Sequence, residues 1–484
     1  MSSVPQGHTL IIGLGLSGSA VARHLARLDV PFMMADTRKA PPGLQAFHEA
    51  YPNVAIHCGP LTELDLAQAK EIVLSPGVDP YTPGLETLWE RRLAGNAREP
   101  KTTESDIKPP AIVGEIALFV RQCKAPIAAI TGSNAKSTVT TLLGEMASEA
   151  GVKVAVGGNL GTPALDLLHD HPDAELFVLE LSSFQLETTP RLCAAAVAFL
   201  NLSEDHLDRH GDMRRYRAAK STIFCGADYA IVNGEDSLSW PQEKESNQAP
   251  DPVWEKFTTQ APQADEWGIA GYDDGRETQP WLMHGVNPLM AVADMRLPGQ
   301  HNHANALAAM AMGHRLGLPL TAMQRVLKRF PGLPHRGELI GEGQGVRWIN
   351  DSKGTNVGAT LAAMAGLGAT LAGKLIWLGG GQGKGADFTP LKAPLEQYAR
   401  EAIVFGIDAA RLAEAVEGAV PVTHTRNLQE ALARAASIAC SGDCVLLSPA
   451  CASLDQFANY MARGDAFRGW VQQHLAVRGD QEHS

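Results

Sequence analysis

A lysine flanked by hydroxyl groups stands between a short apolar run and a helical pattern. Residues 125–130 are apolar, residues 131–138 read Thr-Gly-Ser-Asn-Ala-Lys-Ser-Thr, and a helical pattern covers 139–150. Backbone N–H groups at such a helix start cradle phosphate oxygens, a lysine neutralises the outer phosphates of a triphosphate, and a hydroxyl can bind magnesium. We therefore expect a phosphate-binding turn that contacts ATP through Gly132, Ser133, Asn134, Ala135, Lys136, Ser137 and Thr138.

This turn departs from the common phosphate-loop pattern GxxxxGK[ST] at two positions. Ile130 stands at the first glycine and Ala135 at the last. If the backbone at Ala135 needs a positive φ, the alanine Cβ costs free energy that glycine would not. The plain alternative is a strand-to-helix turn that binds nothing.

Further polar groups follow two predicted strands downstream. Glu180 ends the apolar run 177–179, and the polar run 201–209 follows the apolar run 195–200. Parallel sheets build their sites at the carboxyl ends of strands, so Glu180 could hold magnesium and His206 could be a ligand. The alternative for His206 is a surface position in a charged loop. On pattern alone, Lys220 belongs to the basic face of a helix.

A glycine motif near the start of the chain predicts a second nucleotide-binding turn. The apolar run 8–12 meets Gly13, Gly15 and Gly18, and a helical pattern follows through Leu28. A second strand, 30–35, ends at Asp36, whose carboxylate would suit a ribose hydroxyl. The motif alone also fits close strand–helix packing, and it is equally typical of nicotinamide dehydrogenases.

The elements that carry these residues alternate between strand and helix. Strand patterns at 71–74, 374–378, 402–405 and 444–447 continue the alternation, which predicts an α/β chain with parallel sheets and a Rossmann-like first domain. A length of 484 residues predicts two or three domains. The polar stretch 235–294 lacks sustained periodicity and is predicted to be an insertion of short strands and loops.

Composition indicates a globular protein and argues against some partners. The formal charge of −12 disfavours nucleic acid and anionic lipid as partners. The seven cysteines form no CxxC pair, which fits reduced thiols in a cytosol. Neither a secretory leader nor a membrane-spanning run of about 18 apolar residues is expected.

Several separate blocks, taken in order along nearly the whole chain, resemble the Mur ligase family. Besides the turn around Lys136, they cover 157–159, 179–187, 201–209, 299–305, 332–336, 350–356, 383–388 and 448–457. The later blocks are most similar to the family members that add D-glutamate. The resemblance implies three α/β domains: a Rossmann-like UDP-substrate domain over 1–113, a central ATPase-type domain over 114–332, and a doubly wound C-terminal domain over 333–484, which would bind the amino acid.

The resemblance also implies the activity. A ligase of this kind joins UDP-N-acetylmuramoyl-L-alanine to D-glutamate while ATP becomes ADP and phosphate, in peptidoglycan precursor synthesis. Two magnesium ions are implied, the first near Ser137 and Glu180, and the second near His206 and a carbamylated Lys220. Lys136, His206 and Lys220 would be the catalytic side chains. The protein is expected to act in the cytoplasm, as a monomer, on small molecules.

Individual contacts carry over by position. The nucleotide would also meet Asn305, Arg336 and Asp351. The UDP pocket would be formed by Leu16, Ser17, Asp36, Thr37, Arg38 and Gly77, with Asn159 on the muramoyl-alanine part. D-Glutamate would contact Thr355, Lys384, Ser453 and Tyr460. The chain departs from the family at Ala135, Gln382 and Tyr460, where glycine, aspartate and phenylalanine are common.

Four other functions, in three classes, compete with this interpretation. A nicotinamide oxidoreductase leaves the Lys136 turn unused, and a non-catalytic nucleotide-binding regulator leaves the acidic and histidine residues unused. A related ligase with another amino acid, or a folylpolyglutamate synthase, stays closer in chemistry. A folate ligase would not need the first domain.

Overall fold

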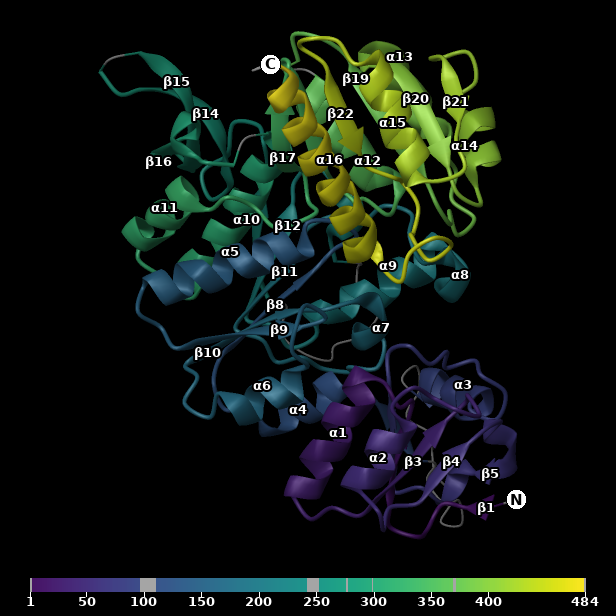
Figure 1. Cartoon of the computed structure of the whole chain (residues 1–484). Helices are drawn as coiled ribbons and strands as arrows, with labels where there is room; N and C mark the ends of the chain where they lie inside the picture. The colour runs from purple at the N-terminus through teal and green to yellow at the C-terminus, as the bar shows by residue number, and fades with distance from the viewer. Residues whose placement is uncertain are drawn as a thin grey trace.

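A computed structural model describes residues 2–95, 110–241, 252–275, 277–297, 299–368 and 371–482. Three large sheets succeed one another along the chain, from the N-terminal part (purple) to the C-terminal part (yellow) in Figure 1. Among these residues, the structure contains no helix long and apolar enough to cross a membrane.

The N-terminal sheet has five parallel strands in the order β4-β3-β2-β6-β7. Its central strands are mostly apolar, as is usual for parallel sheets with helices on both faces. The strands are β2 (Thr9–Ile12), β3 (Phe32–Asp36), β4 (Ile56–Cys58), β6 (Glu71–Leu74) and β7 (Ala111–Val113), and the helices are α1 (Leu16–Arg27), α2 (Leu44–Ala50) and α3 (Glu86–Gly95). A separate two-stranded sheet pairs β1 (Ser2–Ser3) with β5 (Leu64–Asp65).

The central sheet has nine strands in the order β16-β15-β14-β13-β12-β11-β8-β10-β9. They are β8 (Ile127–Thr131), β9 (Val154–Gly158), β10 (Leu176–Glu180), β11 (Ala196–Phe199), β12 (Tyr229–Asn233), β13 (Val253–Phe257), β14 (Trp267–Asp273), β15 (Thr278–His284) and β16 (Asn287–Ala291). The strands from β9 to β14 run parallel, whereas β14, β15 and β16 pair antiparallel.

Where the sequence suggested an insertion, the structure places a continuation of this sheet. The described part of the stretch 235–294 supplies β13 to β16, and Trp267, Leu282 and Met290 are buried in the same apolar cluster as β8. The short strands predicted for this stretch are therefore present, but their bounds could not be predicted, because exposed apolar residues such as Tyr272 of β14 obscure the two-residue alternation.

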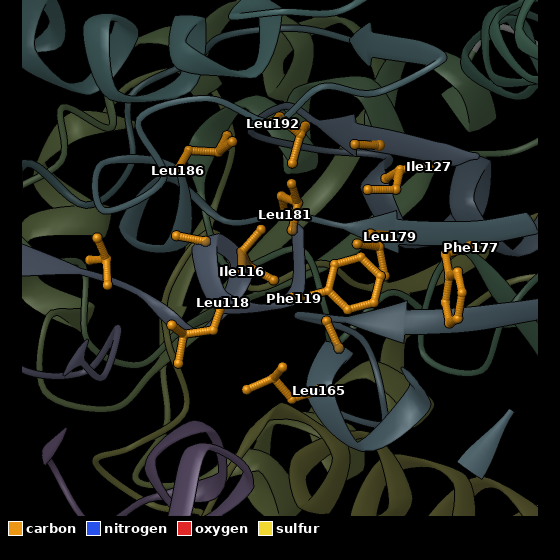
Figure 2. Packing of buried hydrophobic residues seen from close by; sticks show 14 of the residues in the cluster. Ile116, Leu118, Phe119, Ile127, Leu165, Phe177, Leu179, Leu181, Leu186 and Leu192 are labelled. Carbon is orange, nitrogen blue, oxygen red and sulfur yellow. The ribbon is translucent and has the colours of Figure 1, made fainter. Parts of the chain in front are cut away.

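Strand β8 divides its side chains between the two faces of the central sheet. Ala128 and Ile130 pack with α5 (Lys136–Glu149) and α10 (Gln300–Arg315), whereas Ile127 packs with α4 (Glu115–Gln122). Figure 2 shows this second cluster, with Phe119 of α4 set between β10 and the start of α6. The same cluster reaches α1, so α4 and α6 join the N-terminal and central sheets (Figure 1).

The remaining helices of the central part lie near the strand ends or cover α5. They are α6 (Ala164–Asp170), α7 (Ser183–Leu186), α8 (Leu207–His210), α9 (Met213–Ser221) and α11 (Leu320–Arg329). Short 3-10 turns occupy Leu61–Glu63, Leu66–Gln68, Thr222–Phe224, Ser237–Ser239, Val292–Asp294 and Thr389–Leu391.

The C-terminal sheet has six strands in the order β17-β18-β22-β19-β20-β21, all parallel except β17. They are β17 (Glu338–Gly343), β18 (Val346–Asn350), β19 (Leu375–Gly380), β20 (Ala399–Phe405), β21 (Val422–His424) and β22 (Cys444–Leu447). The helices are α12 (Val357–Gly368), α13 (Lys392–Tyr398), α14 (Ala409–Ala415), α15 (Leu428–Ile438) and α16 (Tyr460–Glu482).

The predicted α/β class with a Rossmann-like first sheet and a doubly wound last one is confirmed. The strands predicted from sequence are present as β2, β3, β6, β8, β10, β11, β19, β20 and β22. The boundaries after residues 113 and 332 stay a prediction.

Candidate functional site

The turn between β8 and α5 is fastened to the end of β11. The Ser133 N–H donates to the Asn201 carbonyl at 2.9 Å, and the Asn134 N–H donates to the Asn201 side chain at 2.8 Å. The Ser133 hydroxyl donates to the Ser203 carbonyl at 2.9 Å. The turn is therefore held in place before any ligand arrives.

Ala135 adopts a left-handed conformation, so this position does have the positive φ that the sequence analysis considered for it. Its φ is 66° and its ψ is −9°, directly before α5. An alanine pays about 1 kcal/mol or more for this conformation because its Cβ approaches the carbonyl oxygen. The backbone thus keeps a glycine-like geometry although the residue is not glycine.

Lys136 is the first residue of α5, and its ammonium folds back over the turn. Nζ donates to the carbonyl oxygens of Gly132 at 2.9 Å and Ser133 at 3.0 Å. Burial lowers the pKa of Lys136, although the nearby carboxylates of Glu180 and Asp205 favour the charged form. The cation lies at the turn where phosphate oxygens would be neutralised.

Ser137 and Glu180 form the oxygen-rich side of the site. The Ser137 hydroxyl donates to Glu180 Oε2 at 2.5 Å, and Asn159 Nδ2 donates to Oε1 at 2.7 Å. Burial alone would raise the pKa of Glu180, but the Lys136 charge and these two hydrogen bonds hold it below its usual value. An ionised carboxylate beside a hydroxyl is the donor set that Mg²⁺ prefers.

Lys220 is buried in α9 and faces the same turn. Its Nζ donates to the Gly132 carbonyl at 2.8 Å and to the Thr131 hydroxyl at 3.3 Å, and it lies 4.9 Å from the centre of the Tyr216 ring. Burial, and after it the charge of Lys136, lowers the pKa of Lys220 well below its usual value. This lysine therefore spends time as a neutral amine, the form that reacts with carbon dioxide.

His206 precedes α8 with a φ of 55°, and its ring packs edge to face against Phe184 with the ring centres 4.9 Å apart. Its Nε2 lies 3.6 Å from Asp205 Oδ2. Burial and the neighbouring lysines lower the pKa of His206 to about 4, so the ring stays neutral near pH 7 and can act as a ligand. Within the described residues, no three His, Cys, Asp or Glu side chains are grouped as a metal site. The expected sites instead combine hydroxyl, carboxylate, imidazole and modified lysine.

Arg336 brings the C-terminal part of the chain to the phosphate turn. Its Nη2 donates to the Ser137 hydroxyl at 2.6 Å. Behind it, Asp351 accepts from the Ser448 hydroxyl at 2.7 Å and from the Gly337 N–H at 3.1 Å. Burial raises the pKa of Asp351 to about 7, which the nearby Arg336 opposes.

The residues expected to bind the amino acid lie around the ends of β18, β19 and β22. Lys384 has a φ of 52°, and its Nζ lies 3.6 Å from Asp205 Oδ1 of the central part. Ser453 is buried, and Tyr460 begins α16 with Lys353 Nζ 4.5 Å from its ring centre. Thr355 lies between Lys353 and α12. Gln382, a departure from the family, bonds through its backbone to Ala452.

The expected UDP pocket residues occupy the ends of β2, β3 and β6. Leu16 is 79% exposed at the start of α1, beside Ser17. Asp36 is 2% exposed, and its carboxylate accepts from the Leu14 N–H at 2.8 Å and from Arg38 at 2.7 Å. This carboxylate thus already fixes the glycine turn. The others in the group, Thr37 and Gly77, follow the same strand ends.

The side chain of Asn305 forms its hydrogen bond within its own helix and not with the turn. It is buried in α10, and its amide donates to Asn302 of the same helix at 3.4 Å. The roles of all these residues stay predictions; the structure brings the turn, Glu180, His206, Lys220, Arg336 and Lys384 around one region.

Four residues of this region were missed by sequence reasoning. Lys353 is partly buried, and burial first, then the charges of Lys136 and Arg336, lowers its pKa to about 8. Arg463 is 1% exposed and donates to the carbonyl oxygens of Ser352, Gly380 and Cys451, so it ties together three loops of the site. The other two, Asp205 and Asn356, join the central and C-terminal parts. Lys353 lies in a block that carried the resemblance, whereas Arg463 gave no signal.

Comparisons with known proteins agree on one family. The model of the Mur ligase MurD-like N-terminal domain matches residues 7–93, that of the Mur ligase middle domain matches 130–313, and that of the Mur ligase glutamate ligase domain matches 335–451. The chain is 63% identical to UDP-N-acetylmuramoylalanine--D-glutamate ligase of Chromohalobacter salexigens, covering 97% of this chain and 98% of the relative. The enzyme of the same name from Pseudomonas aeruginosa is 47% identical, with coverage of 98% and 100%.

Solved structures share the fold at low identity. UDP-N-acetylmuramate-alanine ligase MurC from Thermotoga maritima aligns with a TM-score of 0.56 at 16% identity, covering 96% of this chain and 99% of that one. MurF ligase from the same organism, in complex with ADP, gives 0.56 at 15% identity, with coverage of 92% and 96%. At such low identity, these similarities show the fold alone.

Proposed function

This chain belongs to the Mur ligase family, and we propose that it is an ATP-dependent ligase that joins D-glutamate to UDP-N-acetylmuramoyl-L-alanine. The names of the relatives at 63% and 47% identity support this substrate pair. The observation that carries the proposal is the junction at Ser137. There, the phosphate turn, the Glu180 carboxylate and Arg336 of the C-terminal part meet at one hydroxyl.

The reaction needs two steps because a carboxylate is a poor acceptor for an amine. First, the carboxylate of the UDP substrate attacks the γ-phosphorus of ATP, the bond to the ADP oxygen breaks, and an acyl phosphate forms. Next, the amine of D-glutamate attacks the acyl carbon, loses a proton, and expels phosphate. The new amide bond thus replaces the anhydride bond of the acyl phosphate.

Both steps concentrate negative charge, and the chain supplies positive charge at the same place. Lys136, which donates to the turn, and Arg336, which donates to Ser137, would neutralise the phosphate oxygens. Ser137 and Glu180 would hold one magnesium ion, and His206 with a carbamylated Lys220 a second one. When bound, such ions polarise phosphoryl oxygens and template the attack.

The remaining expectations become part of the same proposal. The three parts of the chain, divided after residues 113 and 332, would bind UDP substrate, ATP and amino acid in turn. Residues around Leu16 and Asp36 would bind the UDP group, and Lys384 the amino acid. We also propose that the chain works in the cytoplasm as a monomer on small molecules, as its family membership implies.

Product mass tests the proposal directly. Purified protein with ATP, magnesium and UDP-N-acetylmuramoyl-L-alanine is given D-glutamate, L-glutamate or another amino acid. We expect a dipeptide product and ADP with D-glutamate alone. Product from L-glutamate or another amino acid would show that this amino acid, and not D-glutamate, is joined to the UDP substrate. If a folate substrate alone gives product, the protein is a folylpolyglutamate synthase.

A further inference from the structure

The start of α12 touches the phosphate turn through a reciprocal pair of amides. Asn356 Nδ2 donates to Asn134 Oδ1 at 3.2 Å, and Asn134 Nδ2 donates to Asn356 Oδ1 at 3.3 Å. Asn356 Nδ2 also donates to Asp205 Oδ2 at 3.2 Å. Asn356 is 6% exposed, so these polar groups meet largely away from water. The pair joins the C-terminal part of the chain to the turn that ends in Lys136.

Asn356 has a second function within its own helix. Its Oδ1 accepts from the Ala359 N–H at 2.8 Å, which is the geometry of an N-cap. One side chain therefore fixes the first turn of α12 and places that turn against Asn134. An aspartate in its place would keep the cap but lose both donors.

Gly358 lets the helix approach this closely. A Cβ on Gly358 would lie 2.6 Å from the Ser203 hydroxyl oxygen and 2.9 Å from the Ser203 Cβ. Its φ lies outside the positive range that favours glycine, so the residue is required here for space and not for conformation. Glycine inside a helix costs about 0.5–1 kcal/mol relative to alanine. The helix thus gives up stability at the position where it meets Ser203.

We propose that the start of α12, Asn356 to Ala359, is the docking element that seats the C-terminal part on the phosphate turn, with Asn356 and Gly358 as positioning residues. The inference rests on the proposed ligase function. Thr355, expected to contact D-glutamate, is the residue directly before Asn356. The docking contact therefore sets the distance between the amino acid and the phosphate turn. Neither Asn356 nor Gly358 has a role among the contacts expected from the family.

Two variants separate docking from folding because each preserves or strengthens α12. Gly358→Ala adds a helix-favouring methyl that meets Ser203. Asn356→Asp keeps the N-cap acceptor but places an anion beside Asp205. We expect both to keep the helix content of the wild type, to lower kcat/KM for D-glutamate about tenfold, and to leave the affinity for the UDP substrate within twofold.

The matched control is Gly469→Ala in α16, where an added Cβ meets nothing within 4 Å. It should behave as wild type in kcat/KM. Ser203→Gly removes the atoms that the new methyl of Gly358→Ala contacts, while the Ser203 backbone still bonds Ser133. The double variant should recover at least threefold in kcat/KM for D-glutamate. Wild-type kcat/KM in Gly358→Ala, or a loss that Ser203→Gly does not relieve, overturns the proposal.

The radius of gyration, measured by small-angle X-ray scattering, tests the docking role without relying on the reaction. If docking fails, Gly358→Ala should have a larger radius of gyration than Gly469→Ala, whatever the substrate is. Equal radii would overturn the docking role. Absence of any product from the wild type with D-glutamate would instead overturn the ligase proposal and leave the scattering comparison valid.

Discussion

Lys136 and Lys220 donate to the same carbonyl oxygen, that of Gly132, at 2.9 and 2.8 Å. Two ammonium groups this close repel each other, and burial already disfavours charge on both. The pKa of each is lowered, and that of Lys220 is lowered further below its usual value. We therefore expect the two lysines to divide their tasks, with Lys136 as the cation and Lys220 as the amine that is modified.

Lys136→Ala is expected to abolish the release of phosphate that depends on both substrates. The variant removes an ammonium that donates to the Gly132 and Ser133 carbonyl oxygens of the turn. We expect activity to fall by about a hundredfold to a thousandfold or more, since one transition-state electrostatic contact gives about a hundredfold to a thousandfold in mutagenesis. Phosphate release measured by a coupled assay checks it. Lys153→Ala, an exposed lysine paired with Asp173, is the control and should keep full activity. Near-normal turnover in Lys136→Ala would remove the assignment of the ATP site.

Lys220 should carry a carbamate in the active protein. Carbamylation converts a buried amine into an anionic ligand and removes the repulsion with Lys136. Protein equilibrated with ¹³C-bicarbonate should give a carbamate NMR signal that Lys220→Ala lacks. An active preparation without this signal would refute the modification.

Glu115 predicts a pH dependence of stability. It is 2% exposed at the start of α4, and burial raises its pKa to about 7 from 4.5, although the backbone amides of Leu165 and Ala164 oppose the shift. Between these values the folded chain binds one more proton than the unfolded chain. Stability contributed by this group is complete below about pH 4.5 and is lost as pH rises through 7, by up to about 3 kcal/mol.

Glu115→Gln should remove this slope. Its stability relative to wild type should increase from pH 5 to pH 8 in urea unfolding curves recorded at each pH. Glu49→Gln, on the exposed side of α2, is the control and should follow the wild type at every pH. A constant difference between Glu115→Gln and wild type across this range would show that Glu115 does not titrate near 7.

Ala135→Gly should stabilise the protein by up to about 1 kcal/mol. The change removes the Cβ strain at φ 66°, and this gain exceeds the extra entropy of glycine in the unfolded chain. Chemical unfolding checks it. Ala433→Gly, in the middle of α15, should destabilise by about 1 kcal/mol, because the backbone there is helical and needs no glycine. A loss of stability in Ala135→Gly would mean that the turn carries no strain.

Much of the fold could be predicted because the parallel strands are buried on both faces. Their side chains form continuous apolar runs, such as 127–131 and 444–447, that end at polar residues. The turn around Lys136 and the carboxylate of Glu180 were found for the same reason, since each directly follows such a run. Short strands were predicted in the stretch that holds β14 to β16, but their bounds and their place in the central sheet were not, because their partly exposed faces break the alternation.

The contacts between distant segments could not be predicted. Arg463 donates to backbone carbonyls of three loops. Every residue has such a carbonyl, so these contacts leave no pattern in the sequence. Asn356 and Gly358 look like an ordinary helix start, and their importance depends on Ser203 and Asn134 being opposite. Such roles arise only when the segments are placed in space.

Each large sheet draws its strands from one continuous stretch of chain, 9–113, 127–291 or 338–447. During synthesis, the first sheet can therefore close as soon as β7 has left the ribosome, while the other two are still being translated. Parallel strands pair slowly because their connections are long. A nascent chain that completes one sheet before the next is synthesised exposes few unpaired strands at any moment. This order of strands therefore lowers the risk that strands of different sheets pair with each other.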